Sequence, residues 1–209
     1  MSSQWQLDES DGATRERAPI DGLRLNLGSG QNPKPGYLNV DKVGRPDVLW
    51  DLEQFPWPWE DSSVAEVRLS NVLEHLGATA DVYFGIIREL YRICRDGAVV
   101  DIKVPHPRHD DFLNDPTHVR VVTPEGMTLF SKRFNRLCAE RNAPNTPLAL
   151  HLDVDFELEH VELHFDEPWE SRYRAGLVSV ELLSEHVRQL NNVVKGIHMQ
   201  LRVVKAPPA

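Results

Sequence analysis

A glycine-rich turn and a nearby acidic residue are the first features of this sequence that could hold a ligand. The apolar run 23–27 ends in Gly28-Ser29-Gly30, and the next short apolar stretch ends in Asp41. Glycine has no Cβ and tolerates positive φ, so a ligand can approach such a turn closely. A carboxylate at the end of the following strand is a common partner of ribose hydroxyls. The spacing predicts a nucleoside site, with an ordinary tight turn as the alternative of equal weight.

A second group of reactive side chains lies in residues 105–118, which read PHPRHDDFLNDPTH. Three interpretations stay open: a solvated loop, a general-base site and a divalent metal site. A neutral imidazole can take a proton from a hydroxyl or amine, so His109 and His118 are the candidate bases, with Asp115 orienting one of them. The HxxH spacing in a loop lacks the i,i+4 spacing of a helical zinc motif, so no metal site is predicted.

Composition narrows the class of protein. The chain has 209 residues, 41% of them hydrophobic, and a formal net charge of −9. These values predict one globular domain over 20–209, preceded by a flexible tail over 1–19 without a signal-peptide core. The acidic balance argues against a general nucleic-acid partner, and no apolar run approaches the ~20 residues that cross a membrane. Cys94 and Cys138 lie in helical apolar patterns, which indicates buried free thiols and a cytoplasmic setting.

The elements that must position these residues alternate between strand and helix in the first half of the chain, which predicts a mostly parallel α/β sheet. Strands are expected at 23–27, 37–41, 46–51, 64–69 and 99–104, with a helix capped by Thr79 and ended by Asp96-Gly97. In the second half we expect a helix from Thr123-Pro124 and then a long strand over 153–165, in which the apolar alternation shifts near Glu159-His160. A helix capped by Ser179 and a closing antiparallel strand over 197–204 follow. His160 and His164 share a strand parity, and a core or edge role is expected for each.

The segments LNLGSG, NVD, Asp51-Leu52 and SNVLEHL together resemble class I S-adenosylmethionine-dependent methyltransferases. The resemblance covers residues 23–104 and is greatest to small proteins of the type 11 (UbiE-like) group. It implies a Rossmann-like, mostly parallel seven-stranded sheet with an antiparallel last strand and helices on both faces. It also implies S-adenosyl-L-methionine as the cofactor, and it makes residues 105–150 a substrate-side insertion.

The resemblance assigns cofactor contacts residue by residue. Gly28, Ser29 and Gly30 would lie under the methionine and ribose, and Asp41 would accept hydrogen bonds from the ribose hydroxyls. Asp51 and Leu52 would border the adenine. Asn71 would face the methionine end, and His75 would stand at the substrate side. One departure is visible, because only residues 31–36 separate the glycine turn from the second strand. A parallel crossover normally needs a dozen or more residues, so the first helix must be vestigial or the second strand must start late.

The predicted activity is methyl transfer to a polar small-molecule or saccharide-type acceptor, on oxygen or nitrogen, without a nucleic-acid or membrane partner. No DPPY or NPPY sequence is present, so the usual pattern for exocyclic amines of DNA or for protein glutamine is absent. Two alternatives remain. Another nucleoside-cofactor enzyme such as a dehydrogenase is disfavoured because position 33, the third glycine of GxGxxG, is proline. The second alternative is a degenerate module that binds the cofactor or a partner without turnover.

Overall fold

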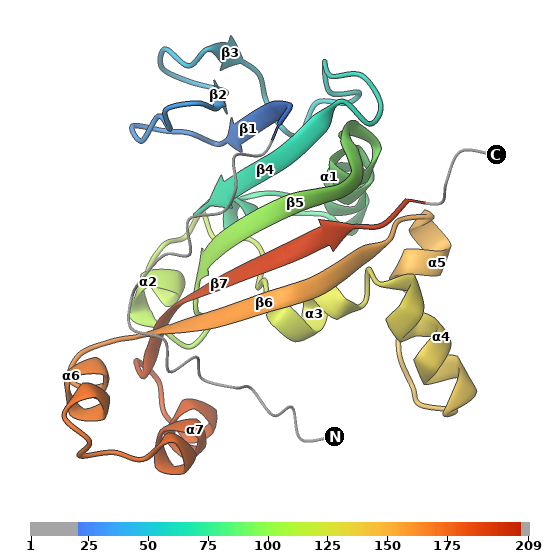
Figure 1. Cartoon of the computed structure of the whole chain (residues 1–209). Helices are drawn as coiled ribbons and strands as arrows, with labels where there is room; N and C mark the ends of the chain where they lie inside the picture. Colours follow the sequence, from blue (N-terminus) through green and yellow to red (C-terminus); the bar gives the residue numbers. More distant parts are fainter. Residues whose placement is uncertain (1–20, 206–209) are drawn as a thin grey trace.

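The computed structural model describes residues 21–205, which build one mixed sheet with helices packed around it (Figure 1). Its seven strands lie in the order β3-β2-β1-β4-β5-β7-β6. They are β1 (Leu23–Leu27), β2 (Leu38–Asp41), β3 (Val48–Leu49), β4 (Val64–Ser70), β5 (Cys94–Pro105), β6 (Phe156–Phe165) and β7 (Val194–Val203). Neighbours from β3 to β5 are parallel, whereas β7 is antiparallel to both β5 and β6. The predicted mostly parallel sheet with an antiparallel last strand is therefore confirmed, while the predicted tail over 1–19 lies outside the described residues.

Most of the helices in the described residues begin at a side-chain cap. The helices are η1 (Leu73–His75), α1 (Ala80–Ile93), α2 (Asp110–Leu113), α3 (Pro124–Thr128), α4 (Lys132–Glu140), α5 (Leu148–Leu152), α6 (Trp169–Arg174) and α7 (Val180–Gln189). The exceptions to side-chain capping are η1, α5 and α6. Thr79 caps α1 and Ser179 caps α7, as predicted. The single helix expected from Thr123 is wrong, because Ser131 Oγ accepts a hydrogen bond from the Phe134 N–H and starts a new helix, α4.

Strand boundaries in the second half follow the alternating pattern closely. The register of β6 against β7 shifts between Leu158 and His160, where the sequence predicts a shift. The connection from β6 to β7 carries α6 and α7, so the closing pair is antiparallel without being joined by a tight turn. Cys94 and Cys138 are buried free thiols, as expected.

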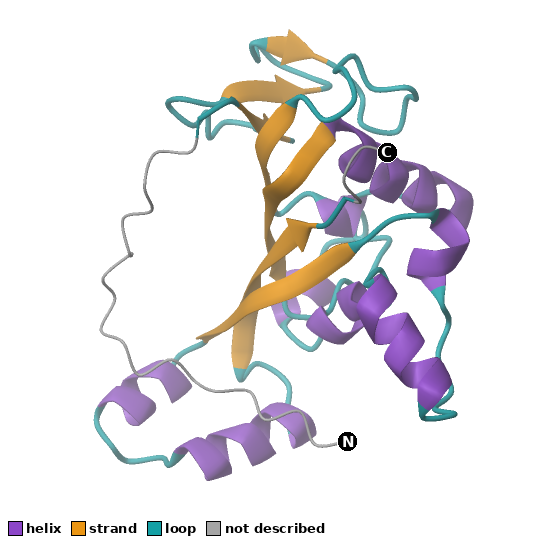
Figure 2. Cartoon of the chain, turned by 45° about the vertical axis from the view of Figure 1, so that its right-hand side comes forward, coloured by secondary structure: helices purple, strands orange, loops and turns teal. Residues whose placement is uncertain are grey.

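The apolar core lies between the sheet and one layer of helices. Ile86 and Leu90 of α1 pack among the buried side chains of the central strands, such as Val67 and Ile102. Figure 2 shows α1, α3, α4 and α5 on the same side of the sheet. The helices α6 and α7 lie apart from this layer, beside the end of the β6–β7 pair (Figure 1), so the described helices surround the sheet. The other face carries partly exposed polar side chains, which alternate with the buried ones along β4, β5 and β7.

The carboxyl ends of the parallel strands are the edge at which ligands of α/β sheets bind. The strand order reverses between β1 and β4, so the segments that follow these two strands meet there. No helix stands between β1 and β2 in this part of the structure, which confirms that the first helix is vestigial. None of the helices described is long and apolar enough to cross a membrane.

Candidate active site

The two glycines of the turn after β1 differ in what surrounds their Cα atoms. Both have positive φ, 65° at Gly28 and 50° at Gly30. A Cβ on Gly28 would lie 2.5 and 2.8 Å from the two Cγ atoms of Val72, in the segment after β4. A Cβ on Gly30 would meet no other atom within 4 Å. Gly28 is therefore required by packing against the neighbouring loop, whereas Gly30 leaves its backbone open to a ligand.

Asp41 ends β2 and holds the glycine turn in place. Its Oδ2 accepts a hydrogen bond from the Gly30 N–H at 2.8 Å, and its Oδ1 accepts one from the Val43 N–H at 3.0 Å. An ionised carboxylate offers about four lone-pair sites, so each oxygen retains capacity for a further donor. The same side chain can thus fix the turn and accept two hydroxyl groups from a ligand lying over Gly30.

A buried polar network takes over the positioning that a first helix would otherwise provide. The Asn26 side-chain amide donates to Asn39 Oδ1 at 2.9 Å, and the same oxygen accepts the Lys34 N–H at 2.7 Å. The Asn39 amide in turn donates to Asp47 at 2.9 Å. These bonds join β1, β2 and both of the following loops, so the short connection between the strands is held without helical structure.

The other predicted cofactor residues follow β3 and β4. Asp51 Oδ1 accepts the Glu53 N–H at 3.0 Å, and Leu52 is buried with its carbonyl bound by the Trp57 indole N–H at 3.0 Å. Asn71 comes directly after β4, has a φ of 54°, and donates its N–H to the Lys103 carbonyl at 2.8 Å. Gly28, Ser29, Gly30, Asp41 and Asn71 thus stand at the carboxyl ends of β1, β2 and β4, as the sequence predicts for one shared edge.

Two segments far apart in the chain are joined on the other side of this edge. The carbonyl of Glu74, in η1, accepts the N–H groups of Val119 and Arg120 at 2.8 and 3.1 Å. This pairing brings the ring of His75 next to the ring of His118, with 4.6 Å between the centroids. The predicted loop residue His118 therefore meets His75, which the resemblance places at the substrate side.

Hydrogen bonds assign the protons on both rings. The Thr117 hydroxyl lies 2.6 Å from Asp115 Oδ1 and 2.9 Å from His75 Nδ1. A carboxylate only accepts, so the hydroxyl donates to Asp115 and accepts from His75 Nδ1–H, which leaves His75 Nε2 as an acceptor. His118 Nδ1 donates to the Phe112 carbonyl at 2.8 Å, and its Nε2 lies 3.7 Å from Asp115 Oδ2. The bonds from Thr117 hold the pKa of Asp115 below its ordinary value.

Glu74 is a residue of this site that the sequence analysis gave no role. Its side chain is buried, with the residue 1% exposed, and neither carboxyl oxygen has a hydrogen-bond partner among the described residues. Burial raises its pKa from the ordinary 4.5 to about 7. One ligand atom each from Glu74, His75 and His118 lie within 4.8 Å of one another. An acid between Leu73 and Leu76 in an otherwise apolar run is the sequence signal that could have identified it.

His109, the other predicted base, has a different environment. It is 5% exposed, its Nδ1 accepts the Asp111 N–H at 3.0 Å as the cap of α2, and its Nε2 donates to Asp166 at 3.0 Å. That bond lowers the pKa of Asp166. Both ring nitrogens are therefore engaged, and the side chain joins the loop after β5 to the end of β6.

Comparisons with known proteins agree with this architecture. No protein-family model and no curated protein matches the chain. A SAM-dependent methyltransferase structure from Archaeoglobus fulgidus is 17% identical and has a TM-score of 0.55, covering 88% of this chain and 87% of its own. A SAM-dependent methyltransferase from Methanosarcina mazei is 11% identical with a TM-score of 0.51, covering 90% and 95%. The YcgJ protein from Bacillus subtilis is 13% identical with a TM-score of 0.50, covering 90% and 94%. The chain thus has the Rossmann-like fold of the SAM-dependent methyltransferases that its sequence resembles.

Proposed function

We propose that this protein transfers a methyl group from S-adenosyl-L-methionine to a polar small-molecule or saccharide-type acceptor. The observation that carries the proposal is the paired Gly30 and Asp41 at the point where the strand order reverses. An open glycine backbone beside a carboxylate with spare lone pairs suits a nucleoside, and the solved structures that share this fold include SAM-dependent methyltransferases.

The residues at this edge fit the cofactor in three parts. Asp41 would accept hydrogen bonds from the ribose hydroxyls, and the backbone from Gly28 to Gly30 would lie under the ribose and methionine. Asp51 and Leu52 would border the adenine, and Asn71 would face the methionine end. When bound, the cofactor supplies a sulfonium-activated methyl group, so the protein mainly has to align the acceptor and remove a proton.

The proton acceptor in this proposal is the pair of histidines after β4 and β5. In the neutral ring His75 Nε2 carries no proton, because Thr117 and Asp115 hold the proton on Nδ1. A neutral imidazole ordinarily titrates near pH 6.5, so it can take a proton from a hydroxyl or ammonium group at neutral pH. The ring of His118 lies between those of His75 and Phe112, and in its neutral form it offers a second Nε2 lone pair. His118, which the sequence predicts as a base together with His109, therefore keeps that role in the proposal. His75 replaces His109, whose two ring nitrogens are both engaged, and Asp115 remains the positioning residue.

The polarity of these surroundings supports a polar acceptor in this proposal. The groups nearest the histidine pair are the Thr117 hydroxyl and the Asp115 and Glu74 carboxyls. The aromatic ring of Phe112 is already stacked on His118, with 5.1 Å between centroids. A flat aromatic acceptor would want free stacking surfaces, whereas a hydroxylated or amine acceptor finds hydrogen-bond partners here.

Cofactor binding is tested by calorimetric titration with S-adenosylhomocysteine. The wild-type chain should bind it, and Asp41→Ala should lose roughly 1.5–3 kcal/mol, the range for hydrogen bonds to a charged group. Asp81→Asn is the matched control, because Asp81 is an exposed acid on α1. Equal affinity in the wild type and Asp41→Ala would remove the ribose role from Asp41. Absence of any binding by the wild type would overturn the proposed function.

Turnover is tested by incubating the chain with the cofactor and a metabolite extract, followed by mass spectrometry for a gain of one methyl group. Replacing the true base by alanine should slow turnover about 10²–10⁴-fold with cofactor affinity nearly unchanged. We expect this loss in His75→Ala or His118→Ala, and wild-type turnover in a folded His109→Ala. Cofactor binding without methylation of any acceptor would favour the degenerate module instead.

A further inference from the structure

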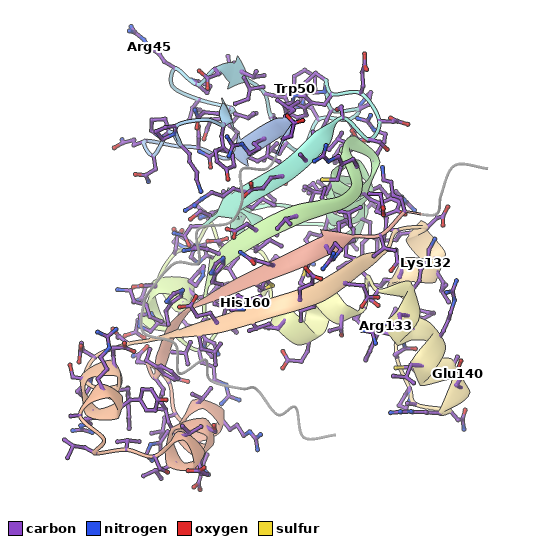
Figure 3. All side chains as sticks on the ribbon, viewed as in Figure 1. Arg45, Trp50, Lys132, Arg133, Glu140 and His160 are labelled. Atoms are coloured by element: carbon purple, nitrogen blue, oxygen red, sulfur yellow. The ribbon has the colours of Figure 1, made fainter. Side chains whose placement is uncertain are left out.

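The open face of the sheet carries a cluster of histidines that the proposed methyl transfer does not use. His160, Glu162 and His164 alternate along β6 and so face the same side, and His198 of β7 lies directly opposite Glu162 in the register. The Glu162 carboxylate lies 3.4 Å from His198 Nδ1, 3.7 Å from His164 Nδ1 and 4.0 Å from His160 Nε2. Three imidazoles thus converge on one carboxylate, and His160 is labelled on β6 in Figure 3.

A fifth residue, Asp101 of β5, fixes the orientation of His198. Its Oδ2 accepts hydrogen bonds from His198 Nε2 at 2.8 Å and from Gln200 at 2.9 Å. The same oxygen already accepts the Gln200 amide N–H, and a carboxylate oxygen only accepts, so the bond with His198 places the imidazole proton on Nε2.

In this tautomer a lone pair of His198 Nδ1 faces a lone pair of the Glu162 carboxylate. With its proton on Nε2, a neutral His198 turns the lone pair of Nδ1 toward the Glu162 carboxylate, which is also an acceptor. Two acceptors at 3.4 Å repel each other unless a cation lies between them. A second proton on His198 would remove this repulsion. A metal ion would remove it as well, and it would also bind the lone pairs of the neighbouring His160 and His164 imidazoles.

We propose that His160, Glu162 and His198, with His164 as a fourth ligand, bind a zinc ion on the open face of the sheet, and that Asp101 orients His198 from behind. Imidazole and carboxylate are ordinary zinc ligands. A carboxylate that accepts the second N–H of a ligating histidine is the usual outer partner in such sites. This proposal is independent of the proposed function, because the cluster lies on β6 and β7 and not at the carboxyl ends of β1 and β2.

The distances are close to what tetrahedral coordination needs. One ligand atom each from His160, Glu162 and His198 already lie within 4.8 Å of one another. Zinc–nitrogen and zinc–oxygen bonds of ~2.0–2.2 Å place tetrahedral ligands roughly 3.3 Å apart. Contraction by up to about 1.5 Å through side-chain rotation would complete the site. His160, Glu162 and His164 have side-chain exposures of 38%, 48% and 45%, so they are free to make that adjustment and the ion can enter from solvent.

The test is calorimetric titration of the full chain with zinc sulfate at pH 7.5, after removal of metal by chelation. We expect one zinc per chain, bound with micromolar affinity or better. His198→Ala and Glu162→Gln should weaken binding at least tenfold, and Asp101→Asn should weaken it about 10–100-fold. Cobalt bound in place of zinc should give the visible absorption of a tetrahedral complex. His151→Ala, which removes an exposed histidine on α5, is the matched control and should bind zinc like the wild type.

The contrary outcomes are distinct. Binding weaker than ~100 µM, or equal affinity in all variants, would mean adventitious binding to surface histidines and would overturn the site. Loss of binding in His75→Ala, with His198→Ala unchanged, would place the ion at the other cluster. If His198→Ala does not fold, the exposed-side-chain variants Glu162→Gln and His160→Ala carry the test. Affinity for S-adenosylhomocysteine should be the same with and without zinc. A chain that binds no zinc would therefore leave the proposed function intact.

Discussion

The buried carboxyl of Glu74 should make the protein less stable as the pH rises, and Glu74→Gln should remove that dependence. Glu74 is buried with no hydrogen-bond partner for either oxygen among the described residues, and its pKa is raised from 4.5 to about 7. Below pH 4.5 the group is protonated in both the folded and the unfolded chain, so its ionisation does not lower the free energy of unfolding. Between the two pKa values the unfolded chain ionises while the folded chain does not, and stability is lost as the pH rises through the folded value.

The size of this loss follows from the two pKa values. A shift of one pKa unit corresponds to about 1.4 kcal/mol, so a rise from 4.5 to about 7 amounts to a full effect on the order of 3 kcal/mol. Most of it develops inside an accessible range, with a decrease of roughly 2.5 kcal/mol in the free energy of unfolding between pH 5 and pH 8. Glutamine keeps the shape and has no charge to gain, so the variant should not show this component.

The assay is urea denaturation of the wild type and Glu74→Gln at several pH values from 5 to 8. The quantity compared is the difference in unfolding free energy between the two proteins at each pH, which cancels every other titrating group. We expect Glu74→Gln to gain on the wild type by roughly 2.5 kcal/mol across this range. Glu60→Gln, at an exposed position before β4, should show a constant difference. A constant difference for Glu74→Gln as well would show that Glu74 ionises normally in the fold, and the reasoning from its burial would be refuted.

Three further predictions concern the glycine turn, His109 and metal. Both positions have positive φ, so alanine should strain the backbone at each by about 1–2 kcal/mol. Gly28→Ala should lose a further ~1–3 kcal/mol through its clash with Val72, whereas Gly30→Ala, which meets no other atom, should also weaken S-adenosylhomocysteine binding; equal thermal shifts in the two variants would contradict this. His109→Ala should lose about 0.5–2 kcal/mol of stability in urea denaturation, because it removes the cap of α2, without slowing turnover. Chelation should lower the melting temperature by emptying the zinc site and leave turnover unchanged; loss of activity on chelation would make a metal part of the methyl transfer.

Local patterns were sufficient to predict most of the sheet. Alternation and caps identify an element from its own residues, as at Thr79 for α1 and Ser179 for α7. The prediction of one helix after Thr123 was wrong because Ser131 offers a second cap, and an apolar face that continues through Phe134 conceals the break. Apolar periodicity reports which side of a helix is buried, but it is insensitive to a short interruption that keeps the same face inward.

The site residues divide according to how far their partners lie along the chain. Gly30 and Asp41 could be predicted because each ends a strand, and the ends of parallel strands share an edge. The pairing of His75 with His118 could not, because it depends on hydrogen bonds from Val119 and Arg120 to the Glu74 carbonyl, which no local pattern specifies. His109 has the residue type of a base, but only its two partners in the fold show that both nitrogens are already occupied.

The order of the strands explains how one sheet can carry two unrelated sites. Because β7 lies between β5 and β6, Asp101 and Glu162 flank His198 from opposite sides on one face of the sheet. The glycine turn and Asp41 lie instead at the end of β1 and β2, on the other side of β4 and β5. An ion on β6 and β7 joins neighbouring strands and adds stability by binding only the folded chain, while the cofactor edge is built from contacts that do not include those strands. Stability and cofactor affinity should therefore respond separately to zinc, which is why the two must be measured together.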